Sequence, residues 1–188
     1  MGDLILIRHA EPVVEESQPP REWALSDSGR LRCRRVAARL VRYDVSRLVG
    51  STERKATQTA RLLGTHLGLP VVIQEGLQEN DRTGVPFYAG EAEFKRSIRD
   101  FFAEPGARVM GAESADEAHR RFLRALEEHG PVPGAVAIVS HGAVISLCIA
   151  RANGLDPYQV WTDLGFGSIA VLTRPGFALR EIVHDSTD

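Results

Sequence analysis

The sequence predicts an α/β fold: a three-layer sandwich with a mostly parallel central sheet, helices on both faces and an antiparallel C-terminal edge strand. Short apolar runs rich in β-branched residues, typical of buried parallel strands, alternate with helical patterns. The last two runs instead flank Pro175 and Gly176, a pair typical of a hairpin turn. The chain has 188 residues, of which 43% are apolar, so we expect one buried core and a single domain over residues 1–188.

The first half of the chain predicts three strands and two helices. The strands are residues 4–7, 45–49 and 70–73. Ser26 or Asp27 caps the first helix, whose apolar residues recur at the spacing of one helical face: Cys33, Val36, Ala37, Leu40 and Val41. Ser51 or Thr52 caps the second helix, whose apolar face is Ala56, Ala60, Leu63 and Leu67.

The segment 75–115 has a different character. Up to about Gly90 it is polar and broken by glycine and proline, and a helix over 91–103 follows. We expect this segment to form a cap or insertion over the active site and to set specificity. Its aromatic residues either line the pocket or pack in the core; they are Phe87, Tyr88, Phe94, Phe101 and Phe102.

The last third of the chain returns to regular elements. A helix over 116–128 precedes a strand over 135–139. The helix that follows Gly142 is apolar nearly all round, which indicates full burial. Strands over 169–172 and 178–183 form the predicted hairpin.

Composition excludes several classes of protein. A net charge of −2, from 23 basic and 25 acidic residues, argues against general nucleic-acid binding. Cys33 and Cys148 lie within apolar helical patterns and suggest neither a disulfide nor a metal site. No apolar run approaches a membrane span, and residues 4–7 are too few for the apolar region of a signal peptide. We expect a cytoplasmic protein.

Two of the predicted strands end on a histidine. Arg8 and His9 follow the first strand, and His141 follows the strand over 135–139. Carboxyl ends of parallel strands meet at one edge of a sheet, so both histidines are expected there. Arg54 lies in the first turn of a helix, where unpaired N–H groups already favour an anion. Guanidinium groups match phosphate oxygens, and neighbouring cations would keep His9 neutral as a nucleophile.

These stretches resemble the histidine phosphatase superfamily over essentially the whole chain. The residues that carry the resemblance are Arg8, His9 and Ala10; Ser51 through Arg54 to Gln58, Thr59 and Ala60; and Ser140, His141 and Gly142. Leu25, Ser26 and Gly29, and Leu77 with Glu79, resemble two further segments of the family. Each motif alone is weak, but five in the family's order form a strong joint signal.

The resemblance implies a metal-independent phosphatase that hydrolyses a phosphomonoester through a phosphohistidine, with no cofactor. It implies that His9 is phosphorylated and that Glu79 protonates the leaving group and then activates water. The residues implied to bind the phosphoryl oxygens are Arg8, Arg54, His141 and Gly142. Asp81 is the rival for the role of Glu79, and Arg82 and Arg21 are candidate substrate contacts. The partner is then a small-molecule phosphoester, with neither nucleic acid nor membrane involved.

Departures from the family's pattern bear on the reaction. Ala10 replaces the common glycine after the nucleophile, which matters if that turn needs a positive φ. Glu11 and Glu15 stand in the following loop, where two carboxylates would repel a second phosphate and so favour hydrolysis. Two alternatives remain: a phosphoglycerate mutase-like transfer primed by a bisphosphate, and a non-catalytic module that binds a phosphorylated ligand.

Overall fold

A computed structural model describes residues 2–88, 90–130 and 132–184. Within them, six strands form one sheet in the order β3-β2-β4-β1-β5-β6. Their bounds are β1 (Leu4–Arg8), β2 (Val45–Ser51), β3 (Val71–Gln74), β4 (Ala135–Ser140), β5 (Ile169–Leu172) and β6 (Leu179–Val183). The pairs β1–β4, β4–β2 and β2–β3 are parallel. β5 pairs antiparallel to β1, and β6 pairs antiparallel to β5. The mostly parallel sheet with an antiparallel edge is therefore confirmed.

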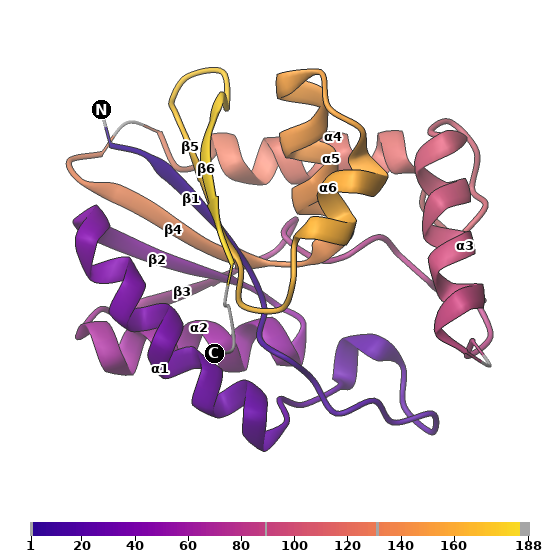
Figure 1. Cartoon of the computed structure of the whole chain (residues 1–188), viewed down its shortest axis with the longest axis horizontal. Helices are drawn as coiled ribbons and strands as arrows, with labels where there is room; N and C mark the ends of the chain where they lie inside the picture. The colour runs from indigo at the N-terminus through magenta and orange to yellow at the C-terminus, as the bar shows by residue number, and fades with distance from the viewer. Residues whose placement is uncertain (1, 89, 131, 185–188) are drawn as a thin grey trace.

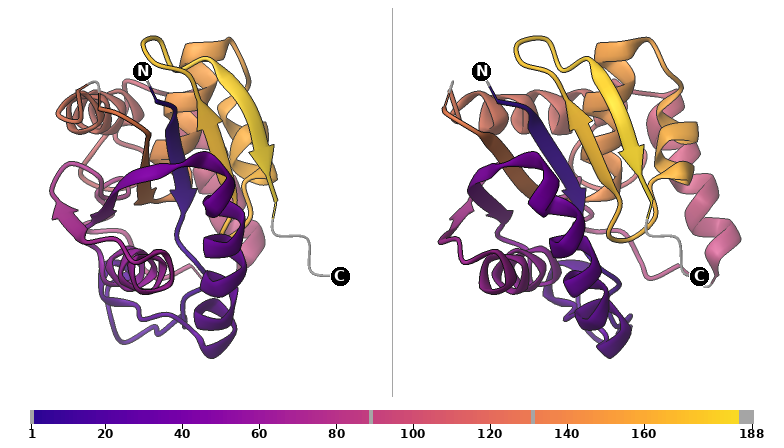
Figure 2. Two further views of the ribbon diagram at one scale, coloured as in Figure 1. Left: turned by 90° about the vertical axis from the view of Figure 1, so that its left-hand side faces the viewer. Right: turned by 60° about the vertical axis from the view of Figure 1, so that its left-hand side comes forward.

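Helices cover both faces of this sheet. The described helices are α1 (Asp27–Leu40), α2 (Arg54–Leu67), α3 (Glu91–Ala103), α4 (Ala115–Glu127), α5 (Gly142–Asn153) and α6 (Pro157–Asp163), with short 3₁₀ turns η1 (Pro20–Glu22) and η2 (Val41–Tyr43). Figures 1 and 2 show α1 and α2 on one side of the sheet and α4, α5 and α6 on the other. α3 lies beyond the carboxyl ends of the parallel strands, at the right of Figure 1. The three-layer arrangement is as predicted.

Alternation along β1 divides the core between the two faces. Leu4 and Leu6 belong to the apolar cluster that contains α4 and α5, whereas Ile5 and Ile7 belong to the cluster that contains α1 and α2. Successive side chains of a strand point to opposite faces, so a strand covered on both sides must be apolar throughout. All six residues of β4 are buried for the same reason.

Two details of the helices differ from the sequence-based expectations. The N-cap residue of α2 is Glu53, whose side chain makes no capping hydrogen bond, rather than Ser51 or Thr52; Ser51 is the last residue of β2. α6 was not predicted, although Asp156 accepts hydrogen bonds from Tyr158 N and Gln159 N and Pro157 occupies the first position of the helix. Both are typical start signals, but seven residues are too few for a clear apolar period.

The segment 75–115 contributes to the same core. Ile98 and Phe101 on α3 are fully buried, and they pack with Leu77 and Phe122 in the cluster on the α4 and α5 side. Cys33 and Cys148 are buried free thiols. In the part of the chain that the structure describes, no helix has both the length and the apolar character needed to cross a bilayer.

Candidate active site

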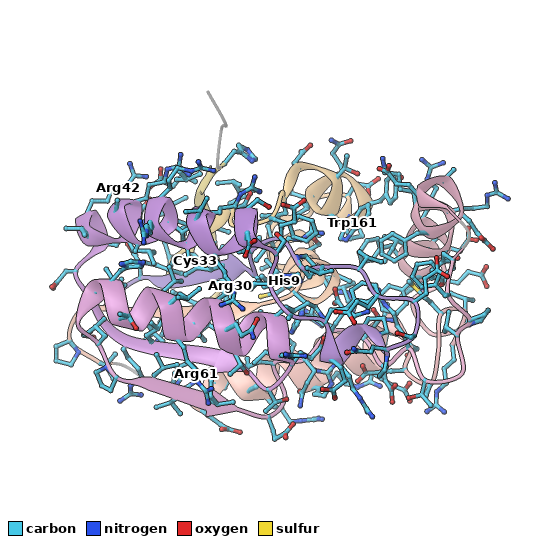
Figure 3. The ribbon with its side chains drawn as sticks, turned by 90° about the horizontal axis from the view of Figure 1, so that it is seen from below. His9, Arg30, Cys33, Arg42, Arg61 and Trp161 are labelled. Atoms are coloured by element: carbon cyan, nitrogen blue, oxygen red, sulfur yellow. The ribbon has the colours of Figure 1, made fainter. Side chains whose placement is uncertain are left out.

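The two histidines that end β1 and β4 lie beside each other. Arg8 pairs with Ser140 in the parallel ladder, so His9 and His141 leave the sheet at the same level. Their ring centroids are 5.2 Å apart, and both side chains are buried, with 5% of His9 and none of His141 exposed. In Figure 3 His9 lies near one end of α1 and α2. The expected convergence at one edge of the sheet is observed.

His9 is held as a neutral imidazole with one nitrogen free. Its Nδ1 lies 2.8 Å from Ala10 O, and because a carbonyl oxygen only accepts, Nδ1 carries the proton and Nε2 keeps its lone pair. Burial lowers the pKa of His9 well below 6.5, and the neighbouring His141 and Lys55 lower it further. We expected nearby cations to be the main cause, but desolvation contributes more.

The turn after His9 accommodates an alanine without strain. The described non-glycine residues with a positive φ are Asp44 and Phe177, so Ala10 has an ordinary backbone conformation. Ala10 N donates to Thr59 Oγ1 at 3.1 Å, and Thr59 Oγ1 donates in turn to Lys55 O at 2.8 Å. This chain of hydrogen bonds ties the turn that carries His9 to α2.

His141 is anchored through one ring nitrogen. Its Nε2 lies 2.9 Å from Ser51 Oγ, whereas its Nδ1 is buried and has no hydrogen-bond partner among the described residues. Burial is the main cause that lowers the pKa of His141 well below 6.5, followed by the charges of Lys55 and Arg82. A buried polar atom without a partner is costly, so Nδ1 marks a position where a polar ligand would be stabilised.

Arg8 is half-buried and lies beside two aromatic rings. Its guanidinium carbon lies 4.5 Å from the ring centroid of Phe166 and 5.8 Å from that of Trp161, and Nη1 donates to Leu164 O. Burial lowers the pKa of Arg8 to about 10, although the charge of Glu79 opposes this. The group therefore remains a cation at neutral pH. Its Nε is buried without a partner in the described part of the protein.

The second cation close to the two histidines is Lys55, which is buried, and not Arg54. Arg54 is exposed at the start of α2 and donates to Glu22 O at 3.2 Å. Lys55 is only 5% exposed, and its charge lowers the pKa of both His9 and His141. The structure thus brings together Arg8, His9, Lys55 and His141, which we call the histidine cluster, and leaves Arg54 at the rim of the cleft.

A carboxylate accompanies Lys55. Glu53 Oε2 lies 2.5 Å from Lys55 Nζ, and Glu53 Oε1 lies 3.7 Å from His141 Nε2. Glu53 is buried, yet its pKa lies below 4.5 because the attraction of Lys55 and the hydrogen bonds it accepts from Lys55 and Glu79 N outweigh desolvation. No local pattern in the sequence selects Glu53, because its contacts come partly from another segment, where Glu79 N donates to it.

Glu79 and Asp81 face different surroundings. Glu79 Oε2 accepts from Ala143 N at 3.1 Å and Oε1 accepts from Val144 N at 3.2 Å, so this carboxylate sits at the N-terminus of α5 beside Gly142. Asp81 is exposed, and hydrogen bonds from the Thr83 side chain and from Thr83 N, at 2.9 Å, lower the pKa of Asp81. Of the two candidate acids, Glu79 is the one close enough to Arg8 to affect its pKa.

The remaining candidates, Arg82, Arg21 and Gly142, line the same cleft. Arg82 Nη2 lies 3.7 Å from Glu79 Oε2, and its guanidinium lies over the ring of Phe94, 5.0 Å from the centroid. Arg21 is exposed on η1 and lines the same cleft. Gly142 lies against Arg8: a Cβ at this position would be 3.2 Å from Arg8 Cζ and 3.0 Å from Trp161 Nε1. Its lack of a side chain makes room for the guanidinium.

A cleft of about 2010 Å³ opens at the carboxyl ends of the parallel strands. Arg8, His9, Lys55 and Glu79 line its floor, and Phe87, Tyr88 and Phe94 line it from the segment 75–115. Phe101 and Phe102 are buried in the core instead. The aromatics of this segment therefore divide between the two roles considered for them. Nowhere in the described ranges do three or more His, Cys, Asp or Glu side chains gather as a metal site would require.

A family model of the histidine phosphatase superfamily (branch 1) matches residues 4–178. The chain belongs to this superfamily. The "Probable phosphoglycerate mutase GpmB" of Yersinia enterocolitica is 25% identical over 169 residues, which cover 84% of this chain and 78% of that protein. Both sequence and fold thus agree with the resemblance carried by the five motifs.

Solved structures of similar fold include two proteins named as phosphatases. A mycobacterial glucosyl-3-phosphoglycerate phosphatase superposes with a TM-score of 0.72 at 22% identity, covering 95% of this chain and 96% of its own. A phosphoserine phosphatase from Entamoeba histolytica has a TM-score of 0.72 at 22% identity, covering 97% of this chain and 96% of its own. At such identity these matches support the histidine phosphatase fold, and a substrate does not follow from them.

Proposed function

We propose that this histidine phosphatase superfamily member is a metal-independent phosphomonoesterase that works through a phosphohistidine at His9. The observation that carries the proposal is a buried, neutral imidazole with a free Nε2 that has two cations near it, the half-buried Arg8 and the buried Lys55. A phosphoryl group needs a nucleophile on phosphorus and positive charge on its oxygens, and the histidine cluster supplies both. The substrate is a small phosphorylated molecule.

Three nitrogen donors are available to the phosphoryl oxygens. Arg8 Nε–H is buried and unpartnered within the described residues. Lys55 supplies an N–H of its ammonium group. Ser51 Oγ accepts from Glu53 N at 3.4 Å, so the Ser51 hydroxyl can donate its own hydrogen to His141 Nε2 and leave Nδ1–H to face the ligand. Phosphate binding would give partners to the two buried nitrogens that lack one among the described residues, Arg8 Nε and His141 Nδ1.

In the first step His9 Nε2 attacks phosphorus and the bond to the ester oxygen breaks. The electron pair of that bond goes to the leaving oxygen, which takes a proton from Glu79. The Nδ1–H bond to Ala10 O holds the imidazole in the tautomer that attacks. Positive charge at Arg8 and Lys55 stabilises the oxygens while phosphorus transfers.

In the second step water attacks the phosphohistidine. Its oxygen bonds to phosphorus, its proton goes to Glu79, and the electron pair of the P–N bond returns to His9 Nε2. Inorganic phosphate is released and both residues regain their starting protonation states. The same carboxylate therefore serves as acid and then as base.

The proposal is tested by hydrolysis of an aryl phosphate in the presence of a chelator and by trapping of the intermediate. We expect phosphate release that the chelator leaves unchanged, and an acid-labile, base-stable phosphoryl label on the protein during turnover. His9→Ala is expected to lose both. His66→Ala, which changes an exposed histidine on α2, is the matched control. Turnover that survives in His9→Ala contradicts the proposal.

A mutase reaction is the second candidate, because the relative from Yersinia enterocolitica carries the name of a phosphoglycerate mutase. Of the two carboxylates expected to repel a second phosphate, Glu11 lines the cleft and Glu15 is not among its lining residues, whereas the neighbouring Glu16 is. Carboxylates at the cleft oppose the binding of a second phosphate. Assays with a phosphorylated sugar acid separate the two reactions. A mutase is primed by a bisphosphate and leaves free phosphate low, whereas a phosphatase releases phosphate without priming. Binding of phosphate without either reaction would identify a non-catalytic phospho-ligand module.

A further inference from the structure

A buried ion pair adjoins the two histidines. Lys55 Nζ and Glu53 Oε2 are 2.5 Å apart, and the side chains are 7% and 10% exposed. Neither residue was singled out in the sequence. Glu53 places a negative charge beside Lys55 and His141, two of the groups that we propose bind phosphoryl oxygens.

The ammonium group of Lys55 donates to two protein acceptors and keeps a third N–H for a ligand. Lys55 Nζ donates to Pro20 O at 2.8 Å and to Glu53 Oε2. An ammonium group has three N–H donors, so one remains for a phosphoryl oxygen. The bound phosphate and Glu53 would then hold the same cation, each weakening the attraction of the other.

The other carboxylate oxygen of Glu53 contacts the rest of the site. Glu53 Oε1 accepts from Glu79 N at 2.8 Å and lies 3.7 Å from His141 Nε2. One carboxylate thus spans the cation, the second histidine and the backbone of the proposed acid. Its negative charge therefore lies against groups that we propose hold the phosphoryl oxygens.

We infer that Glu53 is a positioning residue that acts through Lys55: it fixes the ammonium group in the pocket while lowering the affinity for free phosphate, so that product leaves. The inference rests on the proposed function. Glu53 lies among buried groups, where charges are poorly screened. Removing its charge therefore strengthens the hold of Lys55 on a phosphate dianion.

The inhibition constant of inorganic phosphate against aryl phosphate hydrolysis tests this inference. Glu53→Gln keeps an oxygen that can accept from Lys55 or from Glu79 N but loses the charge. We expect phosphate to inhibit this variant about tenfold more tightly than wild type, with kcat no higher. A mere loss of structure would weaken phosphate binding, so the direction of the change separates the two explanations. An unchanged or weaker inhibition overturns the inference.

A double variant shows whether Glu53 acts through Lys55. In the Lys55→Met background, we expect Glu53→Gln to leave the inhibition constant of phosphate unchanged. Tightening that persists there means that Glu53 acts on phosphate directly, and the inference is wrong. Glu181→Gln is the matched control, because Glu181 pairs with Arg42 at 3.1 Å outside the cleft. Its inhibition constant should equal that of wild type.

Folding and function are checked in the same series. Glu53→Gln and Lys55→Met each leave one buried charge unpaired, so circular dichroism and thermal unfolding accompany each assay. If Glu53→Gln does not fold, Glu53→Asp is used. Its side chain is one methylene shorter, so the carboxylate lies farther from Lys55 and phosphate should inhibit this variant more tightly than wild type, but to a smaller degree. If wild type hydrolyses esters but neither variant is inhibited more tightly by phosphate, the inference is refuted and the proposed function is not. Wild type that neither hydrolyses esters nor binds phosphate or vanadate refutes the proposed function and with it the inference.

Discussion

The imidazole rings of His9 and His141 have centroids 5.2 Å apart because Arg8 and Ser140, which precede them, are partners in the parallel ladder between β1 and β4. Two cationic imidazoles at this separation in a buried site would repel each other strongly. Burial and the charge of Lys55 instead lower the pKa of each well below 6.5. The resting site therefore holds two neutral imidazoles.

The pH dependence of kcat/KM should reflect this neutral state. Protonation of His9 removes the nucleophile, and because its pKa is lowered, protonation requires a pH below 6.5. We expect the acidic limb of kcat/KM to lie below that value. Two aryl phosphates with different phosphate pKa values are compared, so that ionisation of the substrate is recognised by its shift. A limb at or above pH 6.5 that is the same for both substrates contradicts the expectation.

The site residues that could be predicted from the sequence are those at the ends of the predicted strands. Arg8, His9 and His141 follow directly from apolar runs, and the parallel sheet brings their ends together. For the second cation, the position in the first turn of a helix favours Arg54, whereas the helical period favours Lys55. Lys55 is spaced by four and eight residues from the buried Thr59 and Leu63, so it lies on the inner face. This signal was present in the sequence.

Lys55 and Arg54 are separated by a pair of substitutions. We expect Lys55→Met to lower kcat/KM by about 10²-fold to 10³-fold, because a buried donor to the phosphoryl oxygens is lost. Arg54→Met, which removes an exposed group bonded to Glu22 O, should change it less than about threefold. Lys55→Met also leaves Glu53 unpaired. The double variant with Glu53→Gln should regain thermal stability without regaining activity. A larger loss in Arg54→Met reverses the assignment.

Glu79 and Asp81 are distinguished by the leaving group. Glu79→Gln removes the proton that the leaving oxygen takes, so we expect kcat to fall about 10²-fold to 10⁴-fold with an alkyl phosphate. The loss should be smaller with a nitrophenyl phosphate, whose leaving group departs without protonation. Asp81→Asn, at an exposed carboxylate bonded to Thr83 N, should stay within about threefold of wild type. The opposite pattern identifies Asp81 as the acid.

The fold was more predictable than the cleft because buried strands and amphipathic helices carry a period. The segment 75–115 carries a period only over α3, and its aromatics divide between core and cleft according to tertiary contacts. Phe101 is fully buried, whereas Phe87 is 46% exposed. Trp161 and Phe166, which flank Arg8, come from a stretch where the sequence predicted no element. They reach Arg8 because the segment that follows α6 passes the end of β1, where Gly167 N donates to Arg8 O.

The hydrogen bond from Ala10 N to Thr59 Oγ1 gives a test of stability. Thr59→Val leaves a buried N–H without a partner, and we expect a loss of about 1–3 kcal/mol in the free energy of unfolding. Thr65→Val is the matched control, because Thr65 also donates to the carbonyl four residues earlier but is exposed. It should change stability by less than about 0.5 kcal/mol. Denaturant unfolding measures both. Equal effects would mean that Ala10 N finds another acceptor.

Gly142→Ala should separate activity from stability. The added Cβ would lie 3.0 Å from Trp161 Nε1 and 3.2 Å from Arg8 Cζ. Arg8 cannot move away freely, because Phe166 covers its guanidinium and Leu164 O accepts from Nη1. We expect kcat/KM to fall about tenfold or more, since the guanidinium is displaced by a few tenths of an ångström from the phosphoryl oxygens.

Thermal stability of Gly142→Ala should change little, because Gly142 is the first residue of α5 and alanine is the better helix former. Gly106→Ala is the control: nothing lies within 4 Å of a Cβ there, so neither activity nor the melting temperature should change. Full activity in Gly142→Ala would mean that Arg8 can shift without cost. The close approach of glycine and guanidinium would then have no role in orienting the substrate.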